Sequence, residues 1–78
     1  MTLYFFSILK KYFPSPVEID LNEPKRVQDI FLEQLGKKQL DVSYLKFVRY
    51  AVDCEYVSGD TLVKDCREIA FIPPVSGG

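Results

Sequence analysis

The first third of the chain contains two segments whose apolar pattern predicts strands. Four of the six residues of segment 2–7 are β-branched or aromatic, which is typical of a strand that is buried on both faces. A polar stretch with two prolines interrupts the pattern. Residues 17–21 then alternate apolar and acidic side chains, which predicts a half-buried strand paired beside the first.

The next apolar residues repeat with helical spacing. One stripe at i, i+3, i+4 and i+8 consists of Val27, Ile30, Phe31 and Leu35. The preceding residues 22–24, Asn-Glu-Pro, favour a helix start, because Asn can cap free amides and Pro is tolerated in the first turn. Gly36 predicts the end of the helix in a left-handed conformation.

Three further segments, 47–52, 55–57 and 68–72, have the composition of strands. The resulting order is strand, strand, helix, strand, strand, strand. This order predicts an α+β fold in which one main helix packs on a small mixed sheet of about five strands. With the first and last strands paired centrally, this is the β-grasp (ubiquitin-like) fold, and residues 1–78 form a single such domain.

Composition limits the chemistry that the chain can perform by itself. The 78 residues include 10 Lys and Arg against 11 Asp and Glu, a net charge of −1, and 47% are hydrophobic. This balance argues against a strongly basic nucleic-acid surface. The chain has no His, which excludes a Ser-His-Asp site, a Cys-His site and a His-ligated metal. We therefore expect a protein that uses a partner's active site.

The remaining features indicate an ordinary cytoplasmic protein. Cys54 and Cys66 lack the spacing of a zinc site, and two cysteines are fewer than a small secreted scaffold usually has. The apolar start of the chain is too short to span a bilayer and has no basic residues ahead of it. We expect a cytosolic location, with no membrane or nucleic-acid partner. Because no Gly-rich phosphate loop is present, we expect no bound cofactor, and any ATP would be held by a partner.

Residues 73–78 predict an extended, flexible tail that leaves the sheet. Pro73 and Pro74 remove two amide donors and hold the backbone extended. Gly77 and Gly78 have no side chains, so the tip is slim enough to enter a partner's site. The terminal carboxylate is the only functional group at that tip. Taken alone, Gly-Gly is equally consistent with a linker or a frayed end.

The segment 69–78 resembles the C-terminal signature of the small, sulfur-carrier subunit of molybdopterin synthase, the MoaD-type members of the ubiquitin-like MoaD/ThiS family. Segments 3–7, 50–57 and 60–65 are similar to the family's first strand, its third strand with hairpin, and its connection before the last strand. The resemblance covers most of the chain and implies the same β-grasp fold.

The resemblance also implies a function for the tail. In this family an E1-like enzyme uses ATP to adenylate the C-terminal carboxylate and then converts it to a thiocarboxylate. The large subunit of molybdopterin synthase, with which the carrier forms a heterotetramer, takes up the tail, and sulfur passes to cyclic pyranopterin monophosphate. Carried over, Gly78 would bear the sulfur and Gly77 would provide clearance. The channel would be lined by Pro73, Pro74, Val75 and Ser76.

Several alternatives remain open at this point. Phe71 would contact the partner together with neighbouring apolar sheet positions, or it would belong to the core. The chain could also carry sulfur for thiamine synthesis or tRNA thiolation, act as a ubiquitin-like protein modifier, or be a plain interaction domain. In the sulfur-carrier reading it is not catalytic alone. Three cation pairs, at 10–11, 25–26 and 37–38, are expected on solvated faces, and we assign none of them to docking.

Relative to the family, both cysteines occupy positions where glycine is expected. They follow acidic residues, in Asp53-Cys54 and Asp65-Cys66. Glycine serves turns with positive φ, so cysteine there should cost on the order of 1 kcal/mol each unless the turn type changes. A disulfide between the two turns is conceivable, but a cytosolic setting favours two free thiols.

Overall fold

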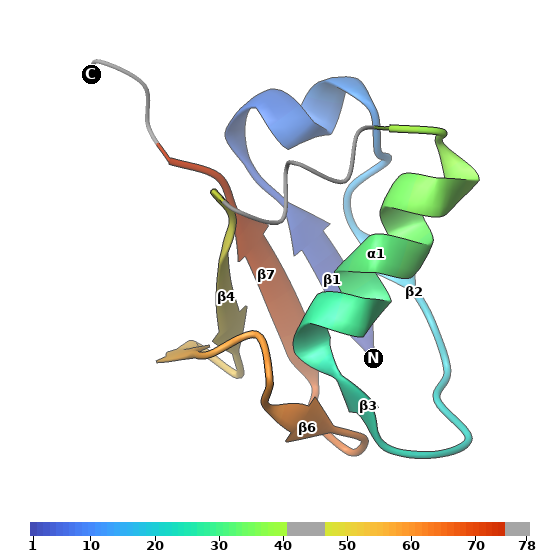
Figure 1. The fold of residues 1–78 in the computed structure, drawn as a ribbon, viewed down its shortest axis with the longest axis vertical. Helices are drawn as coiled ribbons and strands as arrows, with labels where there is room; N and C mark the ends of the chain where they lie inside the picture. The colour runs from blue at the N-terminus through green and yellow to red at the C-terminus, as the bar shows by residue number, and fades with distance from the viewer. Residues whose placement is uncertain (41–46, 75–78) are drawn as a thin grey trace.

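The computed structural model describes residues 1–40 and 47–74. Its main sheet has five strands in the order β2-β1-β7-β4-β5, and β3 and β6 form a second, two-stranded sheet. The strands are β1 (Thr2–Phe5), β2 (Val17–Glu18), β3 (Lys25–Arg26), β4 (Arg49–Val52), β5 (Glu55–Val57), β6 (Leu62–Val63) and β7 (Glu68–Ile72). The helices are the 3-10 helix η1 (Ser7–Lys11) and α1 (Val27–Lys37), as Figure 1 shows.

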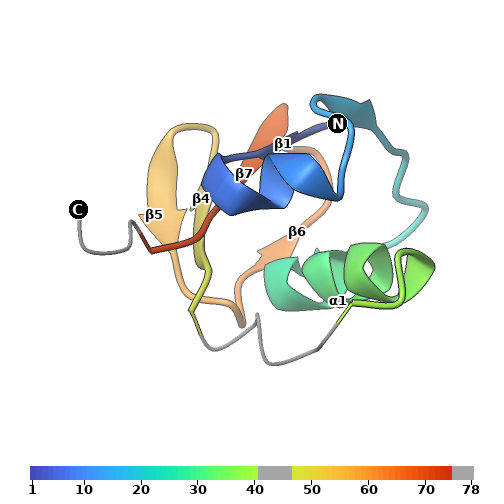
Figure 2. The ribbon, with the colours of Figure 1, turned by 90° about the horizontal axis from the view of Figure 1, so that it is seen from above.

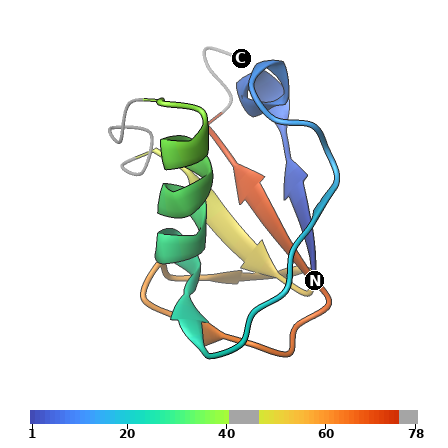
Figure 3. The ribbon, with the colours of Figure 1, turned by 90° about the vertical axis from the view of Figure 1, so that its right-hand side faces the viewer.

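The first and last strands lie side by side in the middle of the main sheet. β1 and β7 are parallel, whereas β4 pairs antiparallel with β7 on its other side. α1 lies on one side of this sheet (Figures 2 and 3). The structure therefore confirms the predicted α+β, β-grasp arrangement, including the central pairing of the first strand with the last.

Alternate residues of the two central strands form the core. The fully buried members on these strands are Leu3, Phe5, Ile69 and Phe71. They pack against the stripe of α1 that was predicted from its spacing, and all four residues of that stripe are fully buried. Burial of each such side chain contributes roughly 1.5–3 kcal/mol relative to leaving it exposed. The apolar stripe of α1 and the alternate apolar residues of β1 and β7 thus form one apolar layer between the helix and the sheet.

Two predictions about the N-terminal strands were wrong. β1 is not buried on both faces, because α1 covers only one face, and Phe6 at its end is 41% exposed on the other. β2 spans only Val17–Glu18 instead of 17–21. The amide of Ile19 donates to the carbonyl oxygen of Met1 at 2.9 Å. The amino group of Met1 in turn donates to the carbonyl oxygen of Ile19 at 2.7 Å, and the pairing of the two segments ends with these two residues.

The start of α1 is held by a distant turn. The predicted cap at Asn22 is wrong, because the helix begins at Val27. The amides of Val27 and Gln28 donate to the carbonyl oxygens of Thr61 and Gly59, at 2.9 and 3.1 Å. These bonds satisfy helix amides that have no partner within the helix. A chain segment from the other half of the protein therefore does the capping.

Gly59 allows the capping turn to pack closely against α1 and the core. A Cβ at this position would lie 2.6 Å from Oε1 of Gln28 and 3.2 Å from Cε2 of Tyr50. A side chain here would require the Gln28 amide group to move away and the Tyr50 ring to shift slightly.

The end of α1 also differs from the prediction. Gly36 lies inside the helix, which runs to Lys37, and Gln39 is the residue with a left-handed backbone, at φ 56°. The amide of Leu40 donates to the carbonyl oxygen of Leu35 at 3.0 Å. Leu40 packs against the core, and this contact draws the chain back over the helix end.

The apolar pattern did not predict η1, which lies between the first two strands. Leu9 of η1 is fully buried, and Phe13 just after it is 3% exposed. The Phe13 ring stacks on Phe5 with a centroid separation of 4.3 Å. Only these two apolar residues enter the core, and their spacing is too short a signal to identify a helix.

Candidate functional site

The tail begins where the central strand β7 ends. The amide of Phe6 donates to the carbonyl oxygen of Phe71 at 3.2 Å, and Arg49 is the last residue paired with β7, opposite Ile72. Pro73 is buried and Pro74 is exposed. Neither proline can donate a backbone hydrogen bond, so the pairing stops at this point. The four remaining candidate residues lie outside the described residues: Val75, Ser76, Gly77 and Gly78.

Phe71 belongs to the core. Its side chain is 0% exposed and lies among three aromatic rings. The centroid distances to Phe31, Phe5 and Tyr50 are 4.9, 5.2 and 5.9 Å. The prediction that Phe71 contacts a partner is therefore wrong, because no part of the ring is exposed to solvent. Its role for the tail is to anchor the strand from which the tail leaves.

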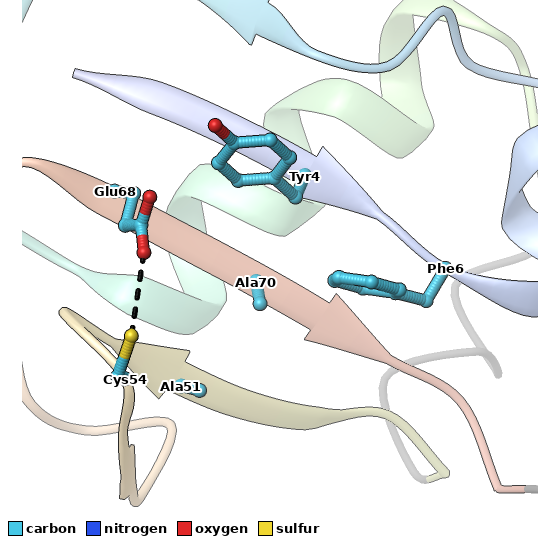
Figure 4. Close-up of a pocket in the computed structure, with 6 residues that line it drawn as sticks. All are labelled: Tyr4, Phe6, Ala51, Cys54, Glu68 and Ala70. Atoms are coloured by element: carbon cyan, nitrogen blue, oxygen red, sulfur yellow. Dashed lines mark hydrogen bonds between the residues drawn. The ribbon is translucent and has the colours of Figure 1, made fainter.

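The open face of the sheet has a hollow near this tail base. One row of aligned residues crosses four strands, and its members are Tyr4, Ala70, Ala51 and Tyr56. Two small side chains thus lie between two tyrosines. The hollow has a volume of about 260 Å³ and is lined by Tyr4, Phe6, Ala51, Cys54, Glu68 and Ala70 (Figure 4). It can accept an apolar side chain, which is the usual anchor of a protein interface.

A tight turn closes one end of the hollow. Asp53 and Cys54 connect β4 to β5 with φ angles of 49° and 70°. Cys54 thus occupies a left-handed position, as its alignment with glycine predicts. Oδ1 of Asp53 accepts hydrogen bonds from the amides of Arg67 and Glu68, at 2.8 and 3.0 Å. This carboxylate ties the turn to the start of β7.

The Cys54 thiol faces a carboxylate. Its Sγ donates to Oε1 of Glu68 at 3.5 Å, the bond drawn in Figure 4. This hydrogen bond and the negative charge of Glu68 raise the pKa of Cys54 above its ordinary value. The thiolate is the nucleophilic form of cysteine. Cys54 is therefore a poor candidate for a sulfur-accepting nucleophile, although it is exposed.

Replacing Glu68 with Gln is expected to make Cys54 react faster. The substitution removes the charge that raises the pKa of the thiol, so a larger fraction is thiolate at mildly alkaline pH. We expect several-fold faster alkylation by iodoacetamide, followed by mass spectrometry of the Cys54 peptide. Glu55→Gln on the same hairpin is the control and should leave the rate unchanged. Equal rates for Glu68→Gln and the unmodified protein would contradict the assigned contact.

Cys66 is a different kind of thiol. It is half-buried, its Sγ lies 3.8 Å from Sδ of Met1, and burial is the main cause that raises its pKa. Its φ is not in the left-handed region, so the strain expected from its alignment with glycine is absent. Both Cys54 and Cys66 are free thiols. The backbone of Cys54 is thus left-handed, whereas that of Cys66 is not.

The described part of the chain contains neither a cluster of metal ligands nor a helix that could span a membrane. Within residues 1–40 and 47–74, no three His, Cys, Asp or Glu side chains gather to hold a metal ion. None of the helices there is long and apolar enough to cross a membrane. The site thus consists of a central strand that ends in two prolines and an apolar hollow on the same sheet.

Comparison with known proteins agrees with this arrangement. No curated protein matches the chain. The sequence model of the ThiS family matches residues 3–78, from the first strand to the C-terminal glycine. Because the match covers nearly the whole chain, this protein belongs to the ThiS family, that is, to the MoaD/ThiS ubiquitin-like sulfur carriers.

Proposed function

We propose that this protein is the sulfur-carrier subunit of molybdopterin synthase and serves molybdenum cofactor biosynthesis. In this proposal Gly78 provides the carboxylate that is adenylated and then converted to a thiocarboxylate. The partners are an E1-like enzyme, which binds the ATP, and the large synthase subunit. The coarser part, a sulfur carrier, follows from the family.

The position of Pro73 and Pro74 carries the proposal. They follow directly on a strand that is paired on both sides, and the first of them is buried while the second is exposed. A tail that starts from such a base has a fixed direction at its origin. Four residues follow Pro74, and fully extended they have a reach of about 14 Å. That reach suits a carboxylate that must enter another protein's active site.

The proposed reaction steps require no acid or base from this chain. The carboxylate oxygen attacks the α-phosphorus of ATP, and pyrophosphate leaves. Hydrosulfide from the sulfur donor then attacks the carbonyl carbon, a C–S bond forms, AMP leaves with the former carboxylate oxygen, and loss of the S–H proton gives the thiocarboxylate. Sulfur transfer to the pterin precursor and hydrolysis return the carboxylate. Proton transfers and charge stabilisation fall to the partner enzymes.

The hollow on the open face is the proposed docking point for the partner during these steps. Tyr4 on β1 and Phe6 directly after β1 flank it, and β1 is the strand next to β7. A partner side chain seated there would fix the origin of the tail relative to the partner's active site. Positioning of this kind accounts for much of the rate of an enzymatic reaction.

Intact mass measurement tests the function. The protein is incubated with its adenylating enzyme, ATP and a sulfur donor, and the C-terminal peptide is analysed. We expect an oxygen-to-sulfur mass shift on the peptide that ends in Gly78. The thiocarboxylated protein is then mixed with the large synthase subunit and cyclic pyranopterin monophosphate, and molybdopterin is expected to form.

The outcomes separate the alternatives. A mass shift without molybdopterin formation would assign the carrier to another pathway, such as thiamine synthesis or tRNA thiolation. Conjugates with other proteins and no mass shift would indicate a ubiquitin-like modifier. If neither a mass shift nor conjugates are observed, the protein is a plain interaction domain and the proposal is wrong.

A further inference from the structure

Positively and negatively charged side chains of the described residues are unevenly distributed between the two ends of the molecule. η1, the C-terminal end of α1 and the base of the tail lie at the same end of the molecule in both Figure 1 and Figure 3. The start of β4 is at this end too, because Arg49 pairs with Ile72. We call this region the tail end. It comprises segments 6–14, 34–40, 47–50 and 71–74.

The tail end is basic. Its four segments contain five cationic side chains and no Asp or Glu. The cations are Lys10, Lys11, Lys37, Lys38 and Arg49. All five are exposed. Two of the cation pairs assigned to solvated faces from the sequence are thus brought together by the fold.

The rest of the described chain is acidic. It contains ten carboxylates and four cations, a side-chain charge of −6 against +5 at the tail end. The ion pairs between described side chains also lie in this part, and they join Lys25 to Glu33 and Arg26 to Asp29 and Asp60. A net charge of −1 therefore conceals a charge separation among the described residues, positive at the tail end and negative in the rest.

Exposed apolar side chains are interspersed with these cations. Phe6 and Ile8 are 41% and 43% exposed, and Phe47 is 59% exposed. Phe6 also lines the hollow on the open face, so the two surfaces are continuous. Aromatic and aliphatic anchors beside exposed charges are typical of protein interfaces.

We propose that the tail end docks on an acidic surface of the adenylating enzyme, around the entrance of the channel that takes up the tail. The inference rests on the proposed function and adds the chemistry of the partner's surface. A protein is favoured over a nucleic acid because the tail must enter a protein site and the anchors are apolar. The side-chain charge of −6 on the other half would repel a polyanion.

The charge separation also orients the encounter. The positive tail end is attracted by the acidic surface of the partner, and the negative far end is repelled by it. The protein therefore approaches with the tail first. Electrostatic steering of this kind raises association rates by about 10- to 1,000-fold, and added salt removes it. The proposal thus predicts strongly salt-dependent association for a protein of nearly zero net charge.

Charge reversal tests the proposal. Lys10→Glu/Lys11→Glu and Lys37→Glu/Lys38→Glu each change the charge of the tail end by the same amount. Lys64→Glu/Arg67→Glu is the matched control, because both residues are exposed and lie in the acidic half. Association with the cognate adenylating enzyme is followed by stopped flow at low and high salt, and thermal unfolding checks that each variant is folded.

We expect each tail-end variant to associate about three- to tenfold more slowly at low ionic strength, with the difference vanishing near 1 M salt. The control should remain within about twofold of the unmodified protein. Wild-type rates for both tail-end variants at low salt would overturn the inference. Loss of polyuridylate binding in those variants, with unchanged association with the enzyme, would assign the surface to nucleic acid and overturn it too.

The two proposals fail in different ways. If the unmodified protein shows no oxygen-to-sulfur mass shift, the proposed function is wrong. If the shift occurs but association is insensitive to salt and to the tail-end charges, only the docking inference is wrong.

Discussion

Deleting Gly78 is expected to reduce thiocarboxylate formation by at least about a hundredfold. The deletion leaves a carboxylate on Gly77, but it withdraws that group by the length of one residue, about 3.5 Å. A displacement of about 1 Å at a reacting group can already cost about a hundredfold in rate. Intact mass after incubation with the adenylating enzyme, ATP and a sulfur donor measures the yield.

The control for this deletion keeps the tail length. Ser76→Ala preserves the position of the carboxylate, so its yield should stay close to that of the unmodified protein. Thermal unfolding of both variants should be unchanged. If the protein lacking Gly78 accepts sulfur at an undiminished rate, Gly78 is not the reacting residue.

Phe71→Ala is expected to lower the free energy of unfolding by about 3–5 kcal/mol. The ring is 0% exposed and contacts three other rings from both sides of the core, so its removal leaves a cavity at the centre of the sheet. A domain of 78 residues has a total of about 4–12 kcal/mol. The variant should therefore be marginally folded in urea or thermal denaturation.

Two further variants make the Phe71 result decisive. Phe47→Ala removes a ring that is 59% exposed and should cost less than about 1 kcal/mol. Phe71→Leu keeps part of the volume and should fold with an intermediate loss of stability. If Phe71→Leu or Phe71→Ala were as stable as the unmodified protein but failed to bind the partner, the ring would be an interface residue and its assignment to the core would be wrong.

Local pattern was sufficient where one element carries its own signal. The stripe from Val27 to Leu35 identified α1, and segment 68–72 matched β7 residue for residue. In both cases the spacing of the apolar side chains predicts which face of the element is buried. The order of these elements then limited the fold to one helix on a mixed sheet.

Local pattern failed where a distant segment supplies the interaction. Asn22 has the right chemistry for a cap, but the carbonyl oxygens of Thr61 and Gly59 cap α1 instead. Gly36 has the right conformational freedom for a helix end, but the contact of Leu40 with the core sets that end. In each case a tertiary contact outweighed a local preference worth about 1 kcal/mol.

The sequence alone determined the fold class and the resemblance of the tail to the C-terminal signature of the sulfur carriers. Both depend on local properties, namely the spacing of apolar residues and the identity of the last residues. Only the tertiary structure decided that Phe71 is core, that Ala51 and Ala70 meet between two tyrosines, and that cations at 10–11 and 37–38 share one end with Arg49. Such neighbours are far apart along the chain. Strand register and the direction of α1 bring them together, and neither can be derived from the residues of any one segment.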